Sequence, residues 1–448
     1  MYAVHMSAPT SPDDSPDAAS DPAAAVVPPA VPERWRTNVA IFLGGQTVSL
    51  FGSMIVQYAV MWYVTLETKS GWALALYALA AFAPQGLVSI FGGTLADRIN
   101  RRILAMVSDG IIALTTLALA LVMMSGITEL WIILLAVGVR SVGAGVQQPA
   151  VQAMIPQIAP PDQLLRVNGL FGTVQSVMTL VAPAAAGLVF GLLGIVPTFF
   201  IDVVTAAIGI GLLALVRVPS LPRMTASATG YFADLADGLR YVSRHGVVRW
   251  LLLVFTIIFL LTVAPSFLTP LMIARSFGDE SWMLAGMEIA FGIGMTLGGV
   301  AVSTFLAKRS RLALILASTF GFATLDVALG LSPNLWVFYG FMFVFGLIVP
   351  AFSAPFMTLI QETTDPDRLG RVFSYVGIVM ALAAPIGMVG FGPLADVVSV
   401  QLLLVLGGIA TAVVMLVAML VPSGRAAMRA ARGPAAEEAR LAEGGVGV

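Results

Sequence analysis

Twelve apolar stretches recur along the chain, and each is about as long as a helix that crosses a lipid bilayer. A hydrocarbon core of about 30 Å needs roughly 20 apolar residues in a helix. We place the spans at residues 39–63, 73–95, 103–124, 130–152, 168–192, 198–216, 250–273, 283–305, 312–330, 335–359, 373–395 and 401–421. The sequence therefore predicts an all-α integral membrane protein with about twelve transmembrane helices.

The composition supports this prediction and narrows the function. Hydrophobic residues make up 58% of the 448 residues and charged residues 10%, whereas soluble proteins carry roughly 25% charge. The net charge of −1 gives no basic field for nucleic acid. With no cysteine and only His5 and His245, the chain has little from which to build a metal site or a histidine-dependent catalytic centre. A Gly-x-x-x-x-Gly-Lys-Ser/Thr loop does not occur, so we predict neither an enzyme nor a bound cofactor or metal.

Basic residues are distributed unevenly between the loops. All but three of the 23 Lys and Arg lie in the N-terminal tail, in the loops after even-numbered spans, or in the C-terminal tail. The exceptions are Lys69 and Arg275, in loops of the other side, and Arg140, within a span. Because basic loops remain on the cytoplasmic side, both termini are predicted to be cytoplasmic.

Three segments outside the spans differ from them in composition. Residues 1–34 are rich in Ala, Pro, Ser and Asp and have no secretory signal pattern, which predicts a disordered cytoplasmic tail. Residues 217–249 form the longest connection, and the apolar spacing after Tyr231 predicts an interfacial helix within this cytoplasmic linker. Residues 423–448 are predicted to form a loose cytoplasmic tail.

The chain contains an internal repeat. The loop segment 161–166, with the pattern Pro-Asp-x-Leu-x-Arg, recurs at 366–371, which is 205 positions further along (366 − 161). Prolines and glycines in equivalent spans keep nearly the same offset. The repeat predicts two six-helix halves, residues 35–216 and 250–422, with a solute site between them, an architecture typical of transporters.

The loop between the second and third spans carries a dense motif, Gly93-Thr-Leu-Ala-Asp97-Arg98-Ile-Asn100-Arg101-Arg102. Its glycine lets two helices touch, and its carboxylate can meet basic groups or a helix N-terminus. The motif resembles the signature G-x-L-x-D-R-x-G-R-R of the major facilitator superfamily. Asn100 replaces a glycine, and we interpret it as tolerating a left-handed turn. The resemblance implies a latch that closes the inner face in the outward-open state, formed by Gly93, Asp97, Arg98, Arg101 and Arg102.

Other segments narrow the resemblance. They are Gln46-Thr-Val-Ser49-Leu-Phe-Gly52-Ser53 with Trp62, Asn168-Gly-Leu with Ala182-Pro183-Ala-Ala-Ala-Gly187, and Gly370-Arg371-Val-Phe373 with Ala384-Pro385-Ile-Gly387. Over roughly residues 35–422 the chain is similar to the macrolide-efflux and enterobactin-exporter branch of drug:proton antiporters. This resemblance implies export of a small molecule in exchange for protons.

Charged side chains within spans are costly and usually face a cavity or a partner. Arg140 resembles, loosely, the superfamily's fourth-span arginine, which is linked to proton coupling; a structural arginine is the alternative. Asp109 is predicted to lie near the height of Arg140 and to pair with it, or else to be a structural carboxylate. Glu288 is predicted to take a proton or a cationic substrate, or else to lie in a wet outer vestibule. Asp202 and Asp326 are interpreted as mostly structural, in peripheral spans.

Polar and aromatic side chains in several spans are candidates for a substrate cavity, although ordinary helix packing is the alternative for each. These candidates are Gln46, Ser49, Gln57, Tyr58, Trp62, Phe255, Phe259 and Phe356.

The sequence and the resemblance together predict a secondary active transporter in a bacterial-type cell membrane. The predicted substrate is an amphiphilic small molecule such as a drug, a macrolide-like compound or a siderophore. Protons are the predicted coupling ion, the lipid bilayer is the surrounding partner, and a monomer is expected. The alternatives are a metabolite importer or lysophospholipid-type flippase of the same superfamily, and a membrane sensor that keeps a transporter fold.

Overall fold

The computed structural model describes residues 34–218, 240–307, 309–365 and 368–431, and the side chains of residues 90–98, 263–266, 423, 427, 430 and 431 are not described. Regular structure in this described part is entirely helical. Its first half contains α1 (Trp35–Thr68), α2 (Gly71–Arg98), α3 (Arg101–Met124), α4 (Leu130–Ile158), η1 (Pro161–Gln163), α5 (Leu164–Leu193) and α6 (Ile195–Leu215). Its second half contains α8 (Gly246–Ser276), α9 (Ser281–Ala301), η2 (Val302–Leu306), α10 (Arg311–Gly330), α11 (Leu335–Thr363), α12 (Leu369–Val397), α13 (Val400–Leu420) and α14 (Pro422–Ala431).

Twelve of the described helices are long and apolar enough to cross a membrane, which confirms the number of spans predicted from the sequence. Large apolar side chains point outward from them: Leu114, Leu192 and Leu215 are 68%, 74% and 64% exposed. Such exposure is costly in water but favourable against lipid tails. Several helices begin earlier or end later than the apolar stretches, because their polar ends extend beyond the stretch that hydropathy detects.

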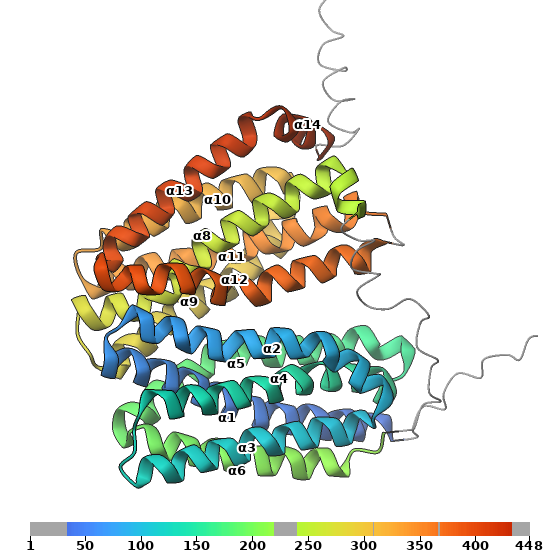
Figure 1. Cartoon of the computed structure of the whole chain (residues 1–448). Coiled ribbons are helices and arrows are strands. Elements are labelled where there is room, and N and C mark those ends of the chain that lie inside the picture. Colours follow the sequence, from blue (N-terminus) through green and yellow to red (C-terminus); the bar gives the residue numbers. More distant parts are fainter. Residues whose placement is uncertain (1–33, 219–239, 308, 366–367, 432–448) are drawn as a thin grey trace, which may run out of the picture.

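The helices form two bundles that repeat one packing pattern (Figure 1). In the first bundle α1 packs on α5 and α6, α2 on α4, and α3 on α4 and α6. The second bundle repeats these contacts, since α8 packs on α12 and α13, α9 on α11, and α10 on α11 and α13. Between the bundles, α2 packs on α12 and α5 on α9, again as equivalent pairs. The predicted two-fold repeat of six helices is therefore confirmed.

Helix α3 begins at a side-chain cap instead of the left-handed turn expected at Asn100. The backbone of Asn100 has φ −58° and ψ 116°, and its side chain accepts hydrogen bonds from the backbone N–H groups of Arg102 and Ile103. Asparagine is among the preferred N-cap residues because its carbonyl oxygen satisfies free N–H groups of the first turn. The interpretation of Asn100 as a left-handed residue is therefore wrong, and the side chain explains why asparagine suits this position.

The connection between the halves and the end of the chain are only partly described. Most of the predicted linker, including the predicted interfacial helix near Tyr231, lies outside the described residues. His245 caps α8, because its Nδ1 accepts a hydrogen bond from the Val248 N–H at 3.4 Å. Residues predicted as the start of a loose tail instead form α14, which packs on α8.

Glycines let α9 and α11 approach until their backbones touch. A Cβ added at Gly294 would lie 2.0 Å from the backbone oxygen of Phe343, and one added at Gly346 would lie 2.1 Å from that of Phe291. Small residues commonly mediate such close contacts between membrane helices. The added atom would meet backbone on both sides, so a larger residue cannot be accommodated by a side-chain rotation.

We expect Gly294→Ala to destabilise the protein by about 1–3 kcal/mol, because overpacking forces the two backbones apart. The thermal unfolding midpoint in detergent measures this effect. Gly299→Ala on the same helix is the matched control, since a Cβ there meets nothing within 4 Å. Equal midpoints for the two variants would contradict the tight crossing of α9 and α11.

Candidate functional site

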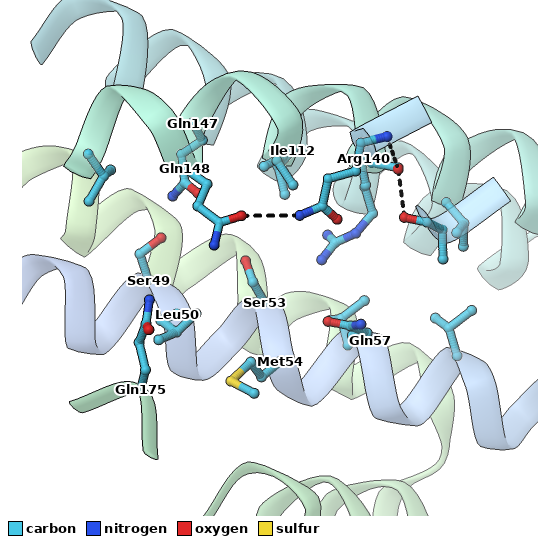
Figure 2. Close-up of a pocket in the computed structure, with 18 of the residues that line it drawn as sticks. Ser49, Leu50, Ser53, Met54, Gln57, Ile112, Arg140, Gln147, Gln148 and Gln175 are labelled. Atoms are coloured by element: carbon cyan, nitrogen blue, oxygen red, sulfur yellow. Dashed lines mark hydrogen bonds between the residues drawn. The ribbon is translucent and has the colours of Figure 1, made fainter. Parts of the chain in front are cut away.

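A polar cavity of about 240 Å³ lies within the first half, between α1, α2, α4 and α5. Figure 2 shows Ser53 and Gln57 of α1, Gln148 of α4 and Gln175 of α5 directed toward one space. Its polar lining comprises Gln46, Ser49, Ser53, Gln57, Gln85, Arg140, Ser141, Gln147, Gln148 and Gln175, together with Tyr77. The predicted cavity residues Gln46, Ser49 and Gln57 therefore lie in the wall of this polar cavity.

A serine of α4 forms hydrogen bonds with the backbone of α2 beside this cavity. Pro84 lies within α2, and next to it the Ser141 hydroxyl accepts from the Gln85 N–H at 3.0 Å and donates to the Ala81 carbonyl at 2.6 Å. The hydroxyl thus stands between two groups that would bond directly in a regular helix, an arrangement that commonly accompanies a bend. Gln85 then reaches the amide of Gln148, with 3.4 Å between its Nε2 and the Gln148 Oε1.

Arg140 forms an ion pair with Asp202 of α6 and not, as predicted, with Asp109. Asp202 also accepts hydrogen bonds from Thr116 at 2.9 Å and from Ser53 at 3.1 Å. The side chain of Asp202 has 0% exposure and that of Arg140 has 12%. Asp202 is therefore an inward-facing residue that joins α1, α3, α4 and α6, although it lies in a helix that we expected to be peripheral.

Asp109 lies behind the polar cavity and is bound to two of the residues that line it. Its Oδ1 accepts hydrogen bonds from Gln147 at 2.8 Å and from Ser49 at 3.4 Å. Its side chain is buried, and its Oδ2 has no hydrogen-bond partner among the described residues. The carboxylate is thus held by neutral donors only, which leaves it available as a proton acceptor.

A second cavity of about 470 Å³ lies between the two halves and has a mainly aromatic and aliphatic wall. The ring of Phe255 stacks on Phe356 with centroids 4.4 Å apart and on Phe259 with centroids 5.1 Å apart. Phe352 extends the stack from Phe356 at 5.8 Å. The predicted residues Tyr58, Phe255, Phe259 and Phe356 all line this second cavity.

Two carboxylates face this apolar wall. Glu288 of α9 and Asp326 of α10 both line the second cavity, and its described lining contains no Lys or Arg. Asp326 is 1% exposed, and its Oδ2 has no hydrogen-bond partner within the described residues. A carboxylate in such a place attracts a cation or a proton. The interpretation of Asp326 as a mostly structural residue in a peripheral span does not account for its position in the cavity wall.

Trp62 does not line either cavity. Its side chain is fully buried, and its ring lies 5.7 Å from that of Tyr58. The ring packs where Gly187 of α5 meets Ala285 of α9, since a Cβ on Gly187 would lie 3.7 Å from Trp62 and 2.4 Å from the Ala285 side chain. The prediction of Trp62 as a cavity residue is therefore wrong, and the residue belongs to the packing between the halves.

The motif loop is described in part. Arg102 donates hydrogen bonds to the carbonyls of Ala214 at 3.3 Å and Val216 at 2.8 Å, at the C-terminal end of α6. Arg101 donates to the carbonyl of Ala153 in α4 at 2.8 Å. Arg102 thus binds the carbonyl-rich C-terminal end of α6, where positive charge is stabilised, and Arg101 binds the backbone of α4. The latch predicted for Gly93, Asp97 and Arg98 concerns side chains outside the described residues.

At the end of the molecule where α1 leads into α2, an acid of one half caps a helix of the other. Asp396 of α12 accepts hydrogen bonds from the N–H groups of Gly71 at 2.7 Å and Trp72 at 2.9 Å, in the first turn of α2. Arg275 of α8 donates to Asp396 at 2.8 Å and to the Lys69 carbonyl at 2.6 Å. These contacts hold the two halves together at this end, and α2 and α12 diverge toward the other end in Figure 1.

An ion pair between loops adds to this closed end. Lys69 lies 3.0 Å from Asp279, and the hydrogen bond and positive charge of Lys69 hold the pKa of Asp279 below its ordinary value. Because the folded-state pKa is lowered, the pair is present at neutral pH and is lost only as the pH falls through that lowered value. Both side chains are exposed, so we expect a small contribution to stability.

We expect Asp396→Ala to shift the molecule toward states that are open at this end, because it removes four hydrogen bonds to one carboxylate. The ratio of open to closed molecules should rise about tenfold or more, because this is the change in an equilibrium constant expected from the loss of one charge-assisted hydrogen bond. Spin labels on Ile127→Cys and Leu331→Cys can report the distance between the halves, since the natural chain has no cysteine. The control is Glu129→Ala, an exposed residue without a capping bond. An unchanged distance distribution in Asp396→Ala would contradict the role of this network.

Comparison with known families identifies the chain. The family described as the Major Facilitator Superfamily matches residues 40–387, which include most of both bundles and the lining residues of both cavities. The chain belongs to the major facilitator superfamily. Members of this superfamily are transporters, so the chain is a membrane transport protein and not an enzyme.

Two relatives of this superfamily member are efflux proteins. Macrolide efflux protein A of Streptococcus pyogenes is 30% identical over 377 residues, which cover 84% of this chain and 93% of the relative. Multidrug efflux pump Tap of Mycolicibacterium fortuitum is 26% identical over 364 residues, which cover 77% of this chain and 86% of the relative.

Solved structures of other superfamily transporters share the fold. A bacterial homolog of the human lysosomal transporter Spinster, in an inward-facing and unoccupied conformation, aligns with a TM-score of 0.61 at 15% identity and covers 90% of this chain and 99% of that one. An auto-inhibited POT family peptide transporter aligns with a TM-score of 0.68 at 12% identity and covers 85% and 95%. At these identities the likeness establishes the fold alone.

Proposed function

We propose that this transporter exports an amphiphilic, weakly basic small molecule, such as a macrolide-like drug, in exchange for protons. The observation that carries the proposal is the second cavity. Its mainly aromatic wall contains two carboxylates, and its described lining residues include no basic side chain. An apolar body gains free energy by burial against such rings, and a protonated amine gains it beside a carboxylate.

The relatives support the direction of transport. One carries the name macrolide efflux protein and another multidrug efflux pump, and each aligns over more than three quarters of this chain. Efflux of a drug-like substrate is therefore the expected activity. A siderophore remains a second substrate class from the sequence analysis, but the acidic cavity favours a basic substrate.

Proton exchange follows from competition for a buried carboxylate. Glu288 in the second cavity and Asp109 behind the first are the candidates for proton uptake, and a bound proton and a bound cationic substrate would exclude one another at Glu288. Arg140 and its partner Asp202 join four helices of the first half, so a change in charge nearby can alter how these helices pack.

Alternating access would arise from rocking of residues 35–216 against residues 250–422 about the central cavity. The contacts around Asp396 would stabilise the state that is closed at their own end. The motif with Asp97 and Arg98 would stabilise the opposite state. We place both termini in the cytoplasm of a bacterial-type cell, on the distribution of basic residues, and we expect a monomer.

The test is transport in everted membrane vesicles from a bacterial host that lacks its own drug pumps. Respiration acidifies the interior of such vesicles, so we expect them to accumulate ethidium and erythromycin when they contain this protein. A protonophore should abolish accumulation, and Asp97→Asn should reduce it. Vesicles without the protein provide the control.

Three outcomes would contradict the proposal in different ways. Accumulation that survives the protonophore would exclude proton exchange. Net uptake of the same compounds by whole cells would indicate an importer. Binding without flux in either preparation would indicate a sensor that keeps the transporter fold.

A further inference from the structure

We propose that the polar cavity of the first half is a binding site for the neutral, hydroxyl-bearing end of the substrate, of the kind that a sugar substituent provides. The apolar body of the same molecule then occupies the second cavity. This inference rests on the proposed function and adds to it, because it specifies a substrate with two chemically different ends.

The two cavities adjoin one another. Met54, Gln57 and Tyr77 line both of them, which places the two ends of one extended molecule within reach of both walls. Their volumes of about 240 and 470 Å³ together lie within the range of roughly 300–1,000 Å³ that is typical of ligand sites. The first cavity has the larger polar lining, and the second has the larger apolar lining.

The chemistry of the first cavity matches hydroxyl groups. Six glutamines line it, and each side-chain amide presents two donors and an acceptor: Gln46, Gln57, Gln85, Gln147, Gln148 and Gln175. A hydroxyl group both donates and accepts, and a sugar ring carries several of them. Amides from four helices therefore offer donors and acceptors on several sides of such a ring, as Figure 2 shows for Gln57, Gln148 and Gln175.

Several of these amides have capacity left for a ligand. Gln147 is engaged by Asp109, and Gln85 bonds to Gln148. The side-chain amides of Gln46 and Gln175 make no hydrogen bond within the described part of the chain, although Gln46 is only 5% exposed. Both side chains line the cavity, so a ligand or water bound there can supply these hydrogen bonds.

The charges around the first cavity favour a neutral group over an ion. Arg140 lines the first cavity, but its positive charge is paired with the carboxylate of Asp202. Asp109 lies behind Gln147 and Ser49 and does not line the cavity. A charged group placed among the amides would lose its hydration without meeting an opposite charge, whereas a hydroxyl-bearing group exchanges water for amides. A basic group of the substrate would instead find Glu288 in the second cavity.

The experiment measures binding of two probes to the purified full-length protein. The probes are erythromycin and its derivative without the neutral sugar cladinose, which keeps the macrolide ring and the basic amino sugar. We expect Gln46→Leu and Gln175→Leu each to weaken erythromycin binding about tenfold, the effect of losing one hydrogen bond, and to change binding of the derivative by less than about twofold. Gln175→Asn, which keeps the amide, should restore part of the lost affinity.

Gln163→Leu is the matched control, because this glutamine lies in the loop helix η1 and binds Asp162 at 2.8 Å, outside both cavities. Retained binding of the derivative shows that each variant is folded. Equal losses for the two probes, or no loss for either, would overturn the inference while leaving the proposed export intact. If the unmodified protein bound neither probe, the proposed macrolide-like substrate would fail together with the inference.

Discussion

Asp202→Ala is expected to have the largest effect of any single substitution considered for this transporter, with loss of transport and a lower unfolding temperature. The change leaves the Arg140 guanidinium within the membrane without its carboxylate and removes the acceptor of Thr116 and Ser53. Breaking a buried ion pair by removing one partner costs about 3–5 kcal/mol, because the remaining charge stays buried. Thermal unfolding in detergent and drug efflux from cells measure the two effects.

The double variant Arg140→Met with Asp202→Leu separates stability from function. It removes both charges, and we expect it to recover much of the unfolding temperature without recovering proton-driven efflux. Asp162→Ala in an exposed loop is the control for loss of an acid as such. Wild-type stability and efflux in Asp202→Ala would show that the pair is dispensable, and efflux by the double variant would remove Arg140 from the coupling mechanism.

Glu288→Gln is expected to reduce efflux of cationic substrates about tenfold or more, which corresponds to roughly 1.4 kcal/mol. Glutamine has nearly the same shape as glutamate but carries no charge and takes up no proton at neutral pH. In the described lining of the second cavity, Glu288 and Asp326 are the acidic residues, so the variant removes one of the two sites at which a cation or a proton can be neutralised. Initial rates of ethidium efflux measure the effect.

A neutral substrate distinguishes the roles that Glu288 could have. If the residue binds the cation alone, Glu288→Gln should leave proton-driven efflux of a neutral drug unchanged. If it carries the exchanged proton, efflux of the neutral drug should also stop responding to the proton gradient. The control is Glu67→Gln, at the exposed C-terminal end of α1. Wild-type ethidium efflux by Glu288→Gln would exclude both roles.

The sequence predicted the helices and their repeat better than it predicted the contacts between side chains. Local sequence was sufficient for the twelve spans, because each membrane helix satisfies its own peptide groups and needs only a long enough apolar stretch. The repeat at 161–166 and 366–371 was sufficient for the two equivalent bundles. The aromatic candidates Phe255, Phe259 and Phe356 all line the second cavity, and their contact with a substrate stays a prediction.

Partners across helices were not predictable in the same way. Each residue along a helix turns the side chain by about 100°, so an error of one or two positions in height or rotation points it at a different neighbour. Asp109 and Arg140 lie on adjacent helices, yet the rotation of α6 brings Asp202 to Arg140 and leaves Asp109 with Gln147. The rotation of α1 likewise decides the place of Trp62. This residue was predicted to line a cavity, but its ring is buried between the halves.

The sequence by itself determined that this protein spans a membrane with two repeated bundles and belongs to a transporter superfamily, because hydropathy, repeats and motifs are properties of the chain in order. Only the tertiary structure decided which polar groups meet. It brought Ser141 to the break at Pro84, set Asp396 on the first turn of α2, and separated an amide-lined cavity from an aromatic one. These contacts depend on the tilt and rotation of packed helices, which long-range packing sets and no single segment encodes.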